Sequence, residues 1–204
     1  MALTFYTNPM SRGRIARWIL EEVGVAYEAV ILDYAASMKA DAYLTVNPMG
    51  KVPAIVHDGK VVTEGAAICA YLADTFAEAG LAPTEAERAD YYRWMFYAAG
   101  PVEAAITNRS LGVVPSAEQQ RMVGYGSYET MVDTFAGAVA ANPFIAGDRF
   151  TAADVYAGSQ VIWGVQFGTL PKLPVFEDYV ARVTTRDAYK RAVAIDDALM
   201  APKG

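Results

Sequence analysis

The residue pattern of the chain changes once, at residues 80–84, and this change constrains the fold more than any other feature. Before it, short apolar and β-branched runs alternate with helical stripes, and after it only helical patterns occur. The sequence Gly-Leu-Ala-Pro-Thr at 80–84 is typical of a linker. The pattern therefore predicts two domains, an α/β domain over 1–79 and an all-helical domain over 85–204, joined by a linker over 80–84.

The first domain is expected to contain a mixed sheet. Strands are predicted over 2–6, 27–32, 53–57 and 60–63, with helices from Ser11 to Gly24 and over 64–77. The first two strands are joined through a helix and should be parallel, with a right-handed crossover. Asp58-Gly59 predicts an antiparallel hairpin. The order β-α-β-(α)-β-β-α is that of a thioredoxin-like domain.

The second domain is expected to be a helical bundle. Helices are predicted over 85–109, 116–141, 151–165, 174–183 and 188–199. Thr151 and Asp154 have the spacing of a capping box, which favours a structural role in starting the third of these helices. Met95, Phe96 and the neighbouring aromatic residues supply more apolar surface than one small helical domain needs, which predicts a C2 homodimer.

Composition excludes several classes of protein. The chain carries 17 Lys+Arg against 23 Asp+Glu, a net charge of −6, whereas a nucleic-acid binder needs a basic face. With one cysteine and one histidine, no internal disulfide, CxxC pair or metal site is expected. Cys69 should be a buried, inert thiol and His57 an exposed residue. The start of the chain is too polar for a signal peptide and no apolar run is long enough to span a membrane, so a cytoplasmic protein is expected.

Ser11 is the first residue that could carry chemistry. It lies in the turn between the first strand and the first helix, where serine is a preferred N-cap and has a structural explanation. The functional alternative is a hydroxyl that donates to a ligand thiolate beside the positive end of a helix. Lowering a thiol pKa from about 8.5 to about 6.5 requires about 2.7 kcal/mol. One hydrogen bond to a charged group supplies about 1.5–3 kcal/mol and the helix terminus up to about 1–2, so together they suffice.

Two further motifs allow both a structural and a functional reading. Pro53 begins a strand, and a cis Val52–Pro53 bond would leave the Val52 backbone free to pair with a peptide-like ligand. Glu64 precedes a helix, where the helix dipole stabilises an acidic residue in any case. Its carboxylate could also capture a ligand ammonium group while the Gly65 N–H captures a ligand carboxylate.

Four segments in succession resemble a bacterial glutathione transferase. They are YTNPMSRGRIARWILEEVG, NPMGKVPAI, TEGAAICAYLAD and AGDRFTAADVY, and the resemblance covers nearly the whole chain. It implies a thioredoxin-like domain followed by a helical bundle, glutathione as co-substrate, an apolar electrophile as second substrate, and a homodimer. It also implies that the capping box is the family's folding motif.

The resemblance implies a role for each candidate residue. Ser11 occupies the place of the thiol-activating residue. Val52, before a cis Pro53, should pair with the cysteinyl backbone of glutathione. Glu64 and Gly65 should hold the γ-glutamyl amino and carboxylate groups. The glycyl carboxylate should meet Lys51 or Lys39.

One departure from the family pattern concerns the thiol chemistry. The motifs look most like the beta class, which has a cysteine immediately before the serine, whereas this chain has Met10 there. Methionine cannot form a mixed disulfide with glutathione, so activation should fall to Ser11, with Tyr6 as the alternative used by other classes. The double-serine-and-cysteine motif of the zeta class is also missing, which argues against a maleylacetoacetate isomerase.

Three functions remain open at this point. The first is transfer of glutathione to an apolar electrophile by addition or displacement. The second is a glutathione-dependent peroxidase or reductase that uses the same site, and the third is a non-catalytic binding module. The electrophile is not identified, although its pocket should involve side chains of the long helix over 85–109 and the loop Gly112–Pro115, with Trp163 and Phe167 as further candidates.

Overall fold

The computed structural model describes residues 2–201, which form two compact units. The first unit runs to Leu81 and also includes the chain from Thr185 onward, and the second is Ala82–Thr184. The break after Leu81 falls inside the predicted linker over 80–84. The structure differs from the predicted boundaries in one respect, because the C-terminal helix packs with the α/β unit and not with the helical one.

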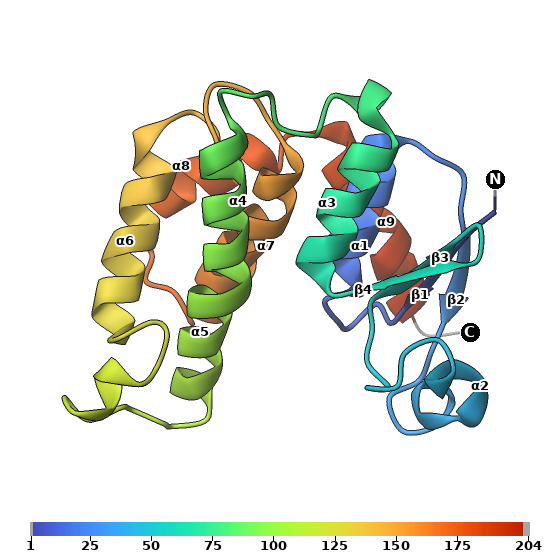
Figure 1. Ribbon diagram of the computed structural model, residues 1–204, viewed down its shortest axis with the longest axis horizontal. Helices are drawn as coiled ribbons and strands as arrows, with labels where there is room; N and C mark the ends of the chain where they lie inside the picture. Colours follow the sequence, from blue (N-terminus) through green and yellow to red (C-terminus); the bar gives the residue numbers. More distant parts are fainter. Residues whose placement is uncertain (1, 202–204) are drawn as a thin grey trace. The chain divides into compact units, whose positions relative to one another are not determined.

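The α/β unit is built on a four-stranded sheet in the order β2-β1-β3-β4 (Figure 1). The strands are β1 (Leu3–Thr7), β2 (Glu28–Ile31), β3 (Ala54–His57) and β4 (Lys60–Thr63). Strand β1 is parallel to β2 and antiparallel to β3, and β4 is antiparallel to β3. The parallel pair, the Asp58-Gly59 hairpin and the thioredoxin-like sheet are therefore confirmed.

Helices and loops cover the two faces of this sheet. Helix α1 (Gly13–Val23) packs against α3 (Gly65–Thr75) and α9 (Asp187–Met200), on the side of the sheet away from α2 (Asp41–Leu44) (Figure 1). Side chains of β1 alternate between the faces, so Leu3 and Phe5 are buried in the core. On the other face a smaller apolar cluster contains Met38, Tyr43 and Tyr6.

Helix α9 packs on the α/β unit through long-range contacts that the local sequence pattern does not predict. Arg17 and Asp196 are both buried to 1% exposure and form an ion pair with a 2.8 Å Nε–Oδ1 distance. The rings of Trp18 and Tyr189 pack edge to face with centroids 4.9 Å apart. Amphipathic periodicity identified α9 as a helix, but periodicity does not specify which unit the apolar face meets.

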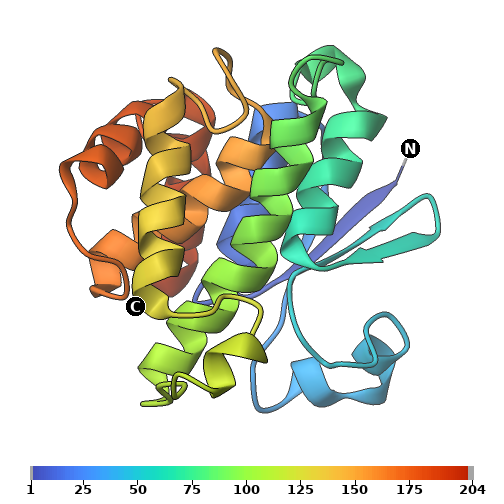
Figure 2. The same cartoon turned by 60° about the vertical axis from the view of Figure 1, so that its left-hand side comes forward.

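The helical unit is arranged around α7, which lies among its other helices (Figure 2). The first eleven residues of α7 are all buried. Such an all-round apolar helix belongs in the interior of a bundle. The helices of this unit are α4 (Arg88–Tyr97), α5 (Glu103–Ser110), α6 (Tyr128–Ala141), α7 (Ala152–Phe167) and α8 (Pro174–Val183).

Two predicted helices of this unit are interrupted. The helix expected over 85–109 contains a π-helical segment, Ala98–Val102, between α4 and α5, and Pro101 within it has no N–H to donate. The helix expected over 116–141 begins only at Tyr128. Gly126 has φ +65°, which breaks the helix, and the Ser127 hydroxyl then caps α6 by accepting the Thr130 N–H at 3.0 Å.

The capping box predicted at the start of α7 is present. The Asp154 carboxylate accepts the Thr151 N–H at 2.8 Å and the Tyr179 hydroxyl at 2.7 Å. Helix α7 thereby begins at a buried, fully bonded carboxylate. Among residues 2–201, no helix combines the length and apolar character needed to cross a bilayer.

Candidate functional site

The three candidate motifs meet at one end of the strands of the sheet. Tyr6 pairs with Ala54 across β1 and β3, and Ala54 pairs with Thr63 across β3 and β4. The end of β1, the start of β3 and the end of β4 therefore lie in one row. The segments that adjoin these three strand ends are the Ser11 turn, Val52–Pro53 and Glu64–Gly65.

The first helix begins one residue later than predicted, so Ser11 is not its N-cap. Helix α1 begins at Gly13 with Arg12 as its N-cap, so Ser11 precedes the cap. Its hydroxyl oxygen nevertheless accepts the Gly13 N–H at 2.9 Å, and its proton goes to the Asn8 carbonyl at 2.6 Å. The hydroxyl is half-buried at the positive end of α1, and turning its proton away from Asn8 would let it donate to a ligand.

Position 13 has no room for a side chain, because the Thr7 hydroxyl lies too close to its Cα. A Cβ at this position would lie 2.0 Å from Thr7 Oγ1 and 3.0 Å from Ser11 Oγ. Thr7 is fully buried, and its hydroxyl has no hydrogen-bond partner among the described residues. Neither Thr7 nor Gly13 was predicted from the sequence, and both matter through their packing against the Ser11 turn. Their only sequence signal is a glycine at the start of a helix.

Gly13→Ala should destabilise the α/β unit and displace Ser11. Overpacking of this severity costs about 1–3 kcal/mol, which exceeds the gain of up to about 1 kcal/mol that alanine brings to a helix. Urea unfolding should show a lower midpoint for the variant. Thr7→Ala combined with Gly13→Ala removes Oγ1 and should recover part of the loss, whereas equal stability of Gly13→Ala and wild type would contradict the close approach.

The Val52 backbone is available at this end of the sheet, just before β3. The Val52–Pro53 bond is cis, and neither the N–H nor the carbonyl of Val52 is hydrogen-bonded within the described chain. The preceding carbonyl, that of Lys51, is held by the Tyr43 hydroxyl at 2.5 Å and by Asn47 Nδ2 at 2.9 Å. Burial raises the pKa of Tyr43 to about 12, so this hydroxyl stays protonated as a donor. Tyr43 and Asn47 support the motif and were not predicted.

The two lysines proposed for the glycyl carboxylate differ in the structure. Lys39 Nζ donates to the Gly50 carbonyl at 2.6 Å and so fastens the loop before Val52. Lys51 is exposed beside the Val52 backbone. The geometry therefore favours Lys51 over Lys39 as the cation that is available to a ligand.

Glu64 has a backbone conformation that few non-glycine residues adopt. Its φ is +64° and its ψ is 117°, and it is the N-cap of α3 without a capping side-chain bond. Its side chain is exposed, and the Gly65 N–H lies in the first turn of α3, where no intrahelical acceptor exists. A carboxylate and a free N–H at one helix start suit the ammonium and carboxylate of an amino acid.

Tyr6, the alternative thiol activator, takes part in a different contact. Its ring packs against the Tyr43 ring with centroids 5.3 Å apart, in the apolar cluster on the α2 face. Ser11 is instead placed at the start of α1, on the turn that follows β1. The structure thus gives Ser11 the surroundings suited to an anion and Tyr6 those of a packed side chain.

The lone cysteine and histidine both lie in the core of the α/β unit. Cys69 is fully buried and burial raises its thiol pKa, which agrees with an inert role. The expectation that His57 is exposed was wrong, because it is 5% exposed and its Nδ1 bonds to the Tyr71 hydroxyl at 2.9 Å. No group of three or more metal-binding side chains occurs between residues 2 and 201.

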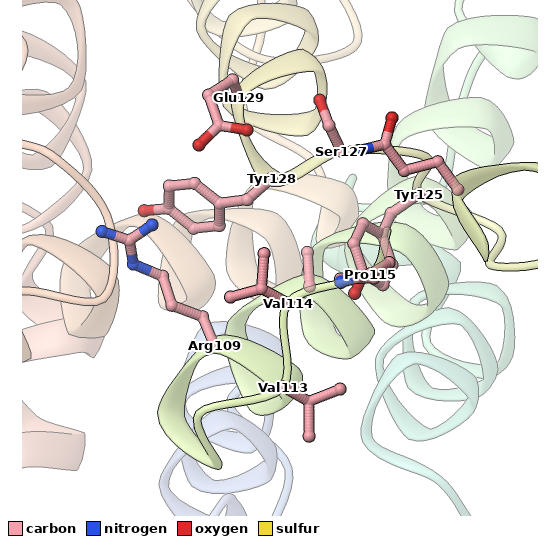
Figure 3. Close-up of a pocket in the computed structure, with 10 residues that line it drawn as sticks. Arg109, Val113, Val114, Pro115, Tyr125, Ser127, Tyr128 and Glu129 are labelled. Carbon is pink, nitrogen blue, oxygen red and sulfur yellow. The ribbon is translucent and has the colours of Figure 1, made fainter. Parts of the chain in front are cut away.

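A separate cavity lies within the helical unit, between the end of α5, the loop after it and the start of α6 (Figure 3). Its volume is about 140 Å³. Val113, Val114 and Pro115 line it, and Trp163 and Phe167 are not part of its wall.

Comparison with known proteins places this geometry in a family. The family described as "Glutathione S-transferase, N-terminal domain" matches residues 1–74. A maleylacetoacetate isomerase from Rhizobium meliloti is 31% identical over 199 residues, which cover 89% of each protein. Glutathione S-transferase GstA of Escherichia coli O157:H7 is 31% identical over 149 residues, which cover 71% of this chain and 73% of that protein. The chain belongs to the glutathione S-transferase family. The predicted family resemblance, with its thioredoxin-like and helical domains, is therefore confirmed.

Two further similar proteins show how far the likeness extends. Protein LigF of a Sphingobium strain is 47% identical over 62 residues, but the chain covers only 24% of that protein's length. A solved structure from Xanthomonas axonopodis pv. citri, described as a theta class glutathione S-transferase with glutathione bound, is 30% identical. It aligns with a TM-score of 0.75 over 94% of this chain and 97% of that one.

Proposed function

We propose that this protein is a glutathione transferase that binds glutathione at this end of the sheet and ionises its thiol with Ser11. The observation that carries the proposal is the Ser11 hydroxyl at the start of α1, in the same row of strand ends as the unpaired Val52 backbone. The glutathione bound to the related Xanthomonas protein supports the choice of ligand. A cytoplasmic location is part of the same proposal.

In this proposal each end of the tripeptide has a partner. The Val52 N–H and carbonyl pair with the cysteinyl backbone, as in strand addition. Glu64 accepts the γ-glutamyl ammonium, the Gly65 N–H donates to its carboxylate, and Lys51 meets the glycyl carboxylate. These contacts set the sulfur beside Ser11.

In the proposed reaction Ser11 is the one protein group that acts on the sulfur. The thiol loses its proton to solvent, and the Ser11 hydroxyl donates to the resulting thiolate. The sulfur electron pair forms a bond to an electrophilic carbon of an apolar substrate. In a displacement the leaving group departs with its electron pair, and in an addition the adjacent atom takes up a proton. Thiol ionisation and proximity supply the rate enhancement.

Ultraviolet difference spectroscopy tests the proposal directly. Glutathione titrated into the protein at pH 7 should produce a saturable thiolate band, and S-methylglutathione, which has no thiol, should bind without one. Calorimetry on the same samples detects binding that gives no band. Binding without a band would support the non-catalytic module, whereas turnover of a peroxide faster than conjugation of a chloronitrobenzene would support the peroxidase.

We also propose that the protein is a homodimer. Phe96 is 67% exposed and stacks on Tyr92, which is 40% exposed, with ring centroids 6.4 Å apart. Met95 was predicted to lie on the same surface, but it is buried in the helical unit at 2% exposure. The surplus apolar surface is thus narrower than predicted and centres on Tyr92 and Phe96.

Phe96→Glu should convert the dimer into a monomer, because a charge at the centre of an apolar interface is costly to bury. Light scattering at micromolar concentration should give twice the chain mass for wild type and the single mass for the variant. Phe167→Glu is the matched control, since Phe167 is 70% exposed and lies on a different helix. A wild-type monomer would contradict the proposal.

A further inference from the structure

The cavity of the helical unit has room for one aromatic ring. Its volume is about 140 Å³, and an apolar cavity of about 150 Å³ is known to accept benzene. Part of the wall is apolar and comes from the loop after α5, where Val113 is 50% exposed and Val114 is 84% exposed. Valine side chains held in solvent at the mouth of a cavity offer a surface that a ring would cover.

The opposite part of the wall carries a cation (Figure 3). The Arg109 guanidinium carbon lies 4.1 Å from the centroid of the Tyr128 ring. This ring is fixed in turn, because the Tyr128 hydroxyl donates to the Thr169 carbonyl at 2.7 Å. Arg109 is thereby held against the cavity wall by stacking.

Arg109 has no carboxylate partner in the described chain. Arg17 and Arg186, by contrast, pair with Asp196 and Glu22 at 2.8 and 2.7 Å. The guanidinium of Arg109 therefore keeps its hydrogen-bond donors for a ligand, and a carboxylate matches their planar geometry. The overall charge of −6 opposes an anion only weakly here, since salt screens charges beyond about 8–10 Å.

Glu129 is the opposing charge in the same wall. Among the described residues it forms no ion pair with Arg109, so it lowers the positive potential around the guanidinium without pairing with it. Burial raises the pKa of the Tyr128 hydroxyl, while Arg109 lowers it and Glu129 raises it, so both charges act at this ring. A bound anion would therefore be attracted by one of these residues and repelled by the other.

We propose that this cavity binds a single aromatic ring that carries an anionic group, with the ring against the loop valines and the anion on Arg109. The inference goes beyond the proposed function, because it concerns a site of the helical unit alone. The binding itself requires only residues of the helical unit.

Nuclear magnetic resonance titration tests the inference with two probes of equal size, benzoate and benzamide, at pH 7 without glutathione. Benzoate should cause saturable shifts in the amides of Arg109, Val113 and Val114, with an affinity at least about fivefold higher than that of benzamide. Arg109→Gln should weaken benzoate roughly tenfold, as expected for one charge-assisted contact, and leave benzamide unchanged. Glu129→Gln should tighten benzoate.

Arg121→Gln is the matched control, because it removes the same charge from an exposed residue outside the cavity wall. Equal affinities for the two probes, equal effects of the two arginine variants, or the absence of saturable shifts would overturn the inference. If benzoate fails while the glutathione thiolate band appears, only this inference is lost. If benzoate binds as expected but the thiolate band is absent, the proposed function is lost and the binding site stands.

Discussion

Ser11→Ala should raise the pKa of bound glutathione by about one to two units and remove most of the thiolate band at neutral pH. One hydrogen bond to a charged group is worth about 1.5–3 kcal/mol, and one pKa unit corresponds to about 1.4 kcal/mol. At pH 6.5, where about half of the bound thiol is ionised if its pKa is about 6.5, the rate of conjugation should therefore fall roughly 5- to 50-fold.

The pH dependence separates this chemical effect from a structural one. Above the pKa of free thiol, near pH 9.5, glutathione is mostly ionised without help, so wild type and Ser11→Ala should have similar rates. A loss of the Gly13 N–H cap alone would lower stability at every pH and would not move the midpoint of the pH profile.

Two variants serve as controls for Ser11→Ala. Ser11→Thr keeps a hydroxyl at the turn and should retain most of the band. Tyr6→Phe should have little effect, since the Tyr6 ring packs against Tyr43 in the apolar cluster. Full activity of Ser11→Ala, together with a loss in Tyr6→Phe, would transfer the role of thiol activator to Tyr6.

The parts of the fold that sequence predicted correctly depend on local patterns. The parallel pair β1–β2 follows from a strand-helix-strand order, and the Asp58-Gly59 hairpin follows from its turn chemistry. The burial of His57 was missed because it depends on Tyr71 and on the packing of α3 over the sheet. The docking of α9 depends on Arg17 and Asp196, which are 179 residues apart.

In the candidate site, too, the residues of local motifs were predicted and the long-range arrangement was not. Ser11, Val52 and Glu64 were identified because each belongs to a short motif beside a predicted strand. Their arrangement in one row depends on the register of β1, β3 and β4, which no single motif specifies. Asn47 and Thr7 were missed because they act on backbone or packing neighbours and belong to no motif with an evident ligand.

Asp154→Ala should be the most destabilising single substitution considered for this chain. The fully buried carboxylate accepts four hydrogen bonds, at 2.7 to 3.0 Å, from the Ile145 and Thr151 N–H groups and the Thr151 and Tyr179 hydroxyls. Alanine would leave these donors buried without an acceptor, and each such group costs about 1–3 kcal/mol. The costs are not additive, and we expect a total loss of at least about 3 kcal/mol.

Thermal and urea unfolding measure this loss, and a decrease in Tm of roughly 6–12 °C is expected for a chain of this size. Asp148→Ala is the matched control, because Asp148 lies exposed in the loop before α7 and should change stability by less than about 0.5 kcal/mol. Asp154→Asn keeps one acceptor oxygen and should lie between the two. Hydrogen exchange should locate the loss in Asp154→Ala at the start of α7 and at Ile145, whose N–H the carboxylate holds in wild type. Equal stability of Asp154→Ala and Asp148→Ala would mean that the buried carboxylate does not hold α7 in place.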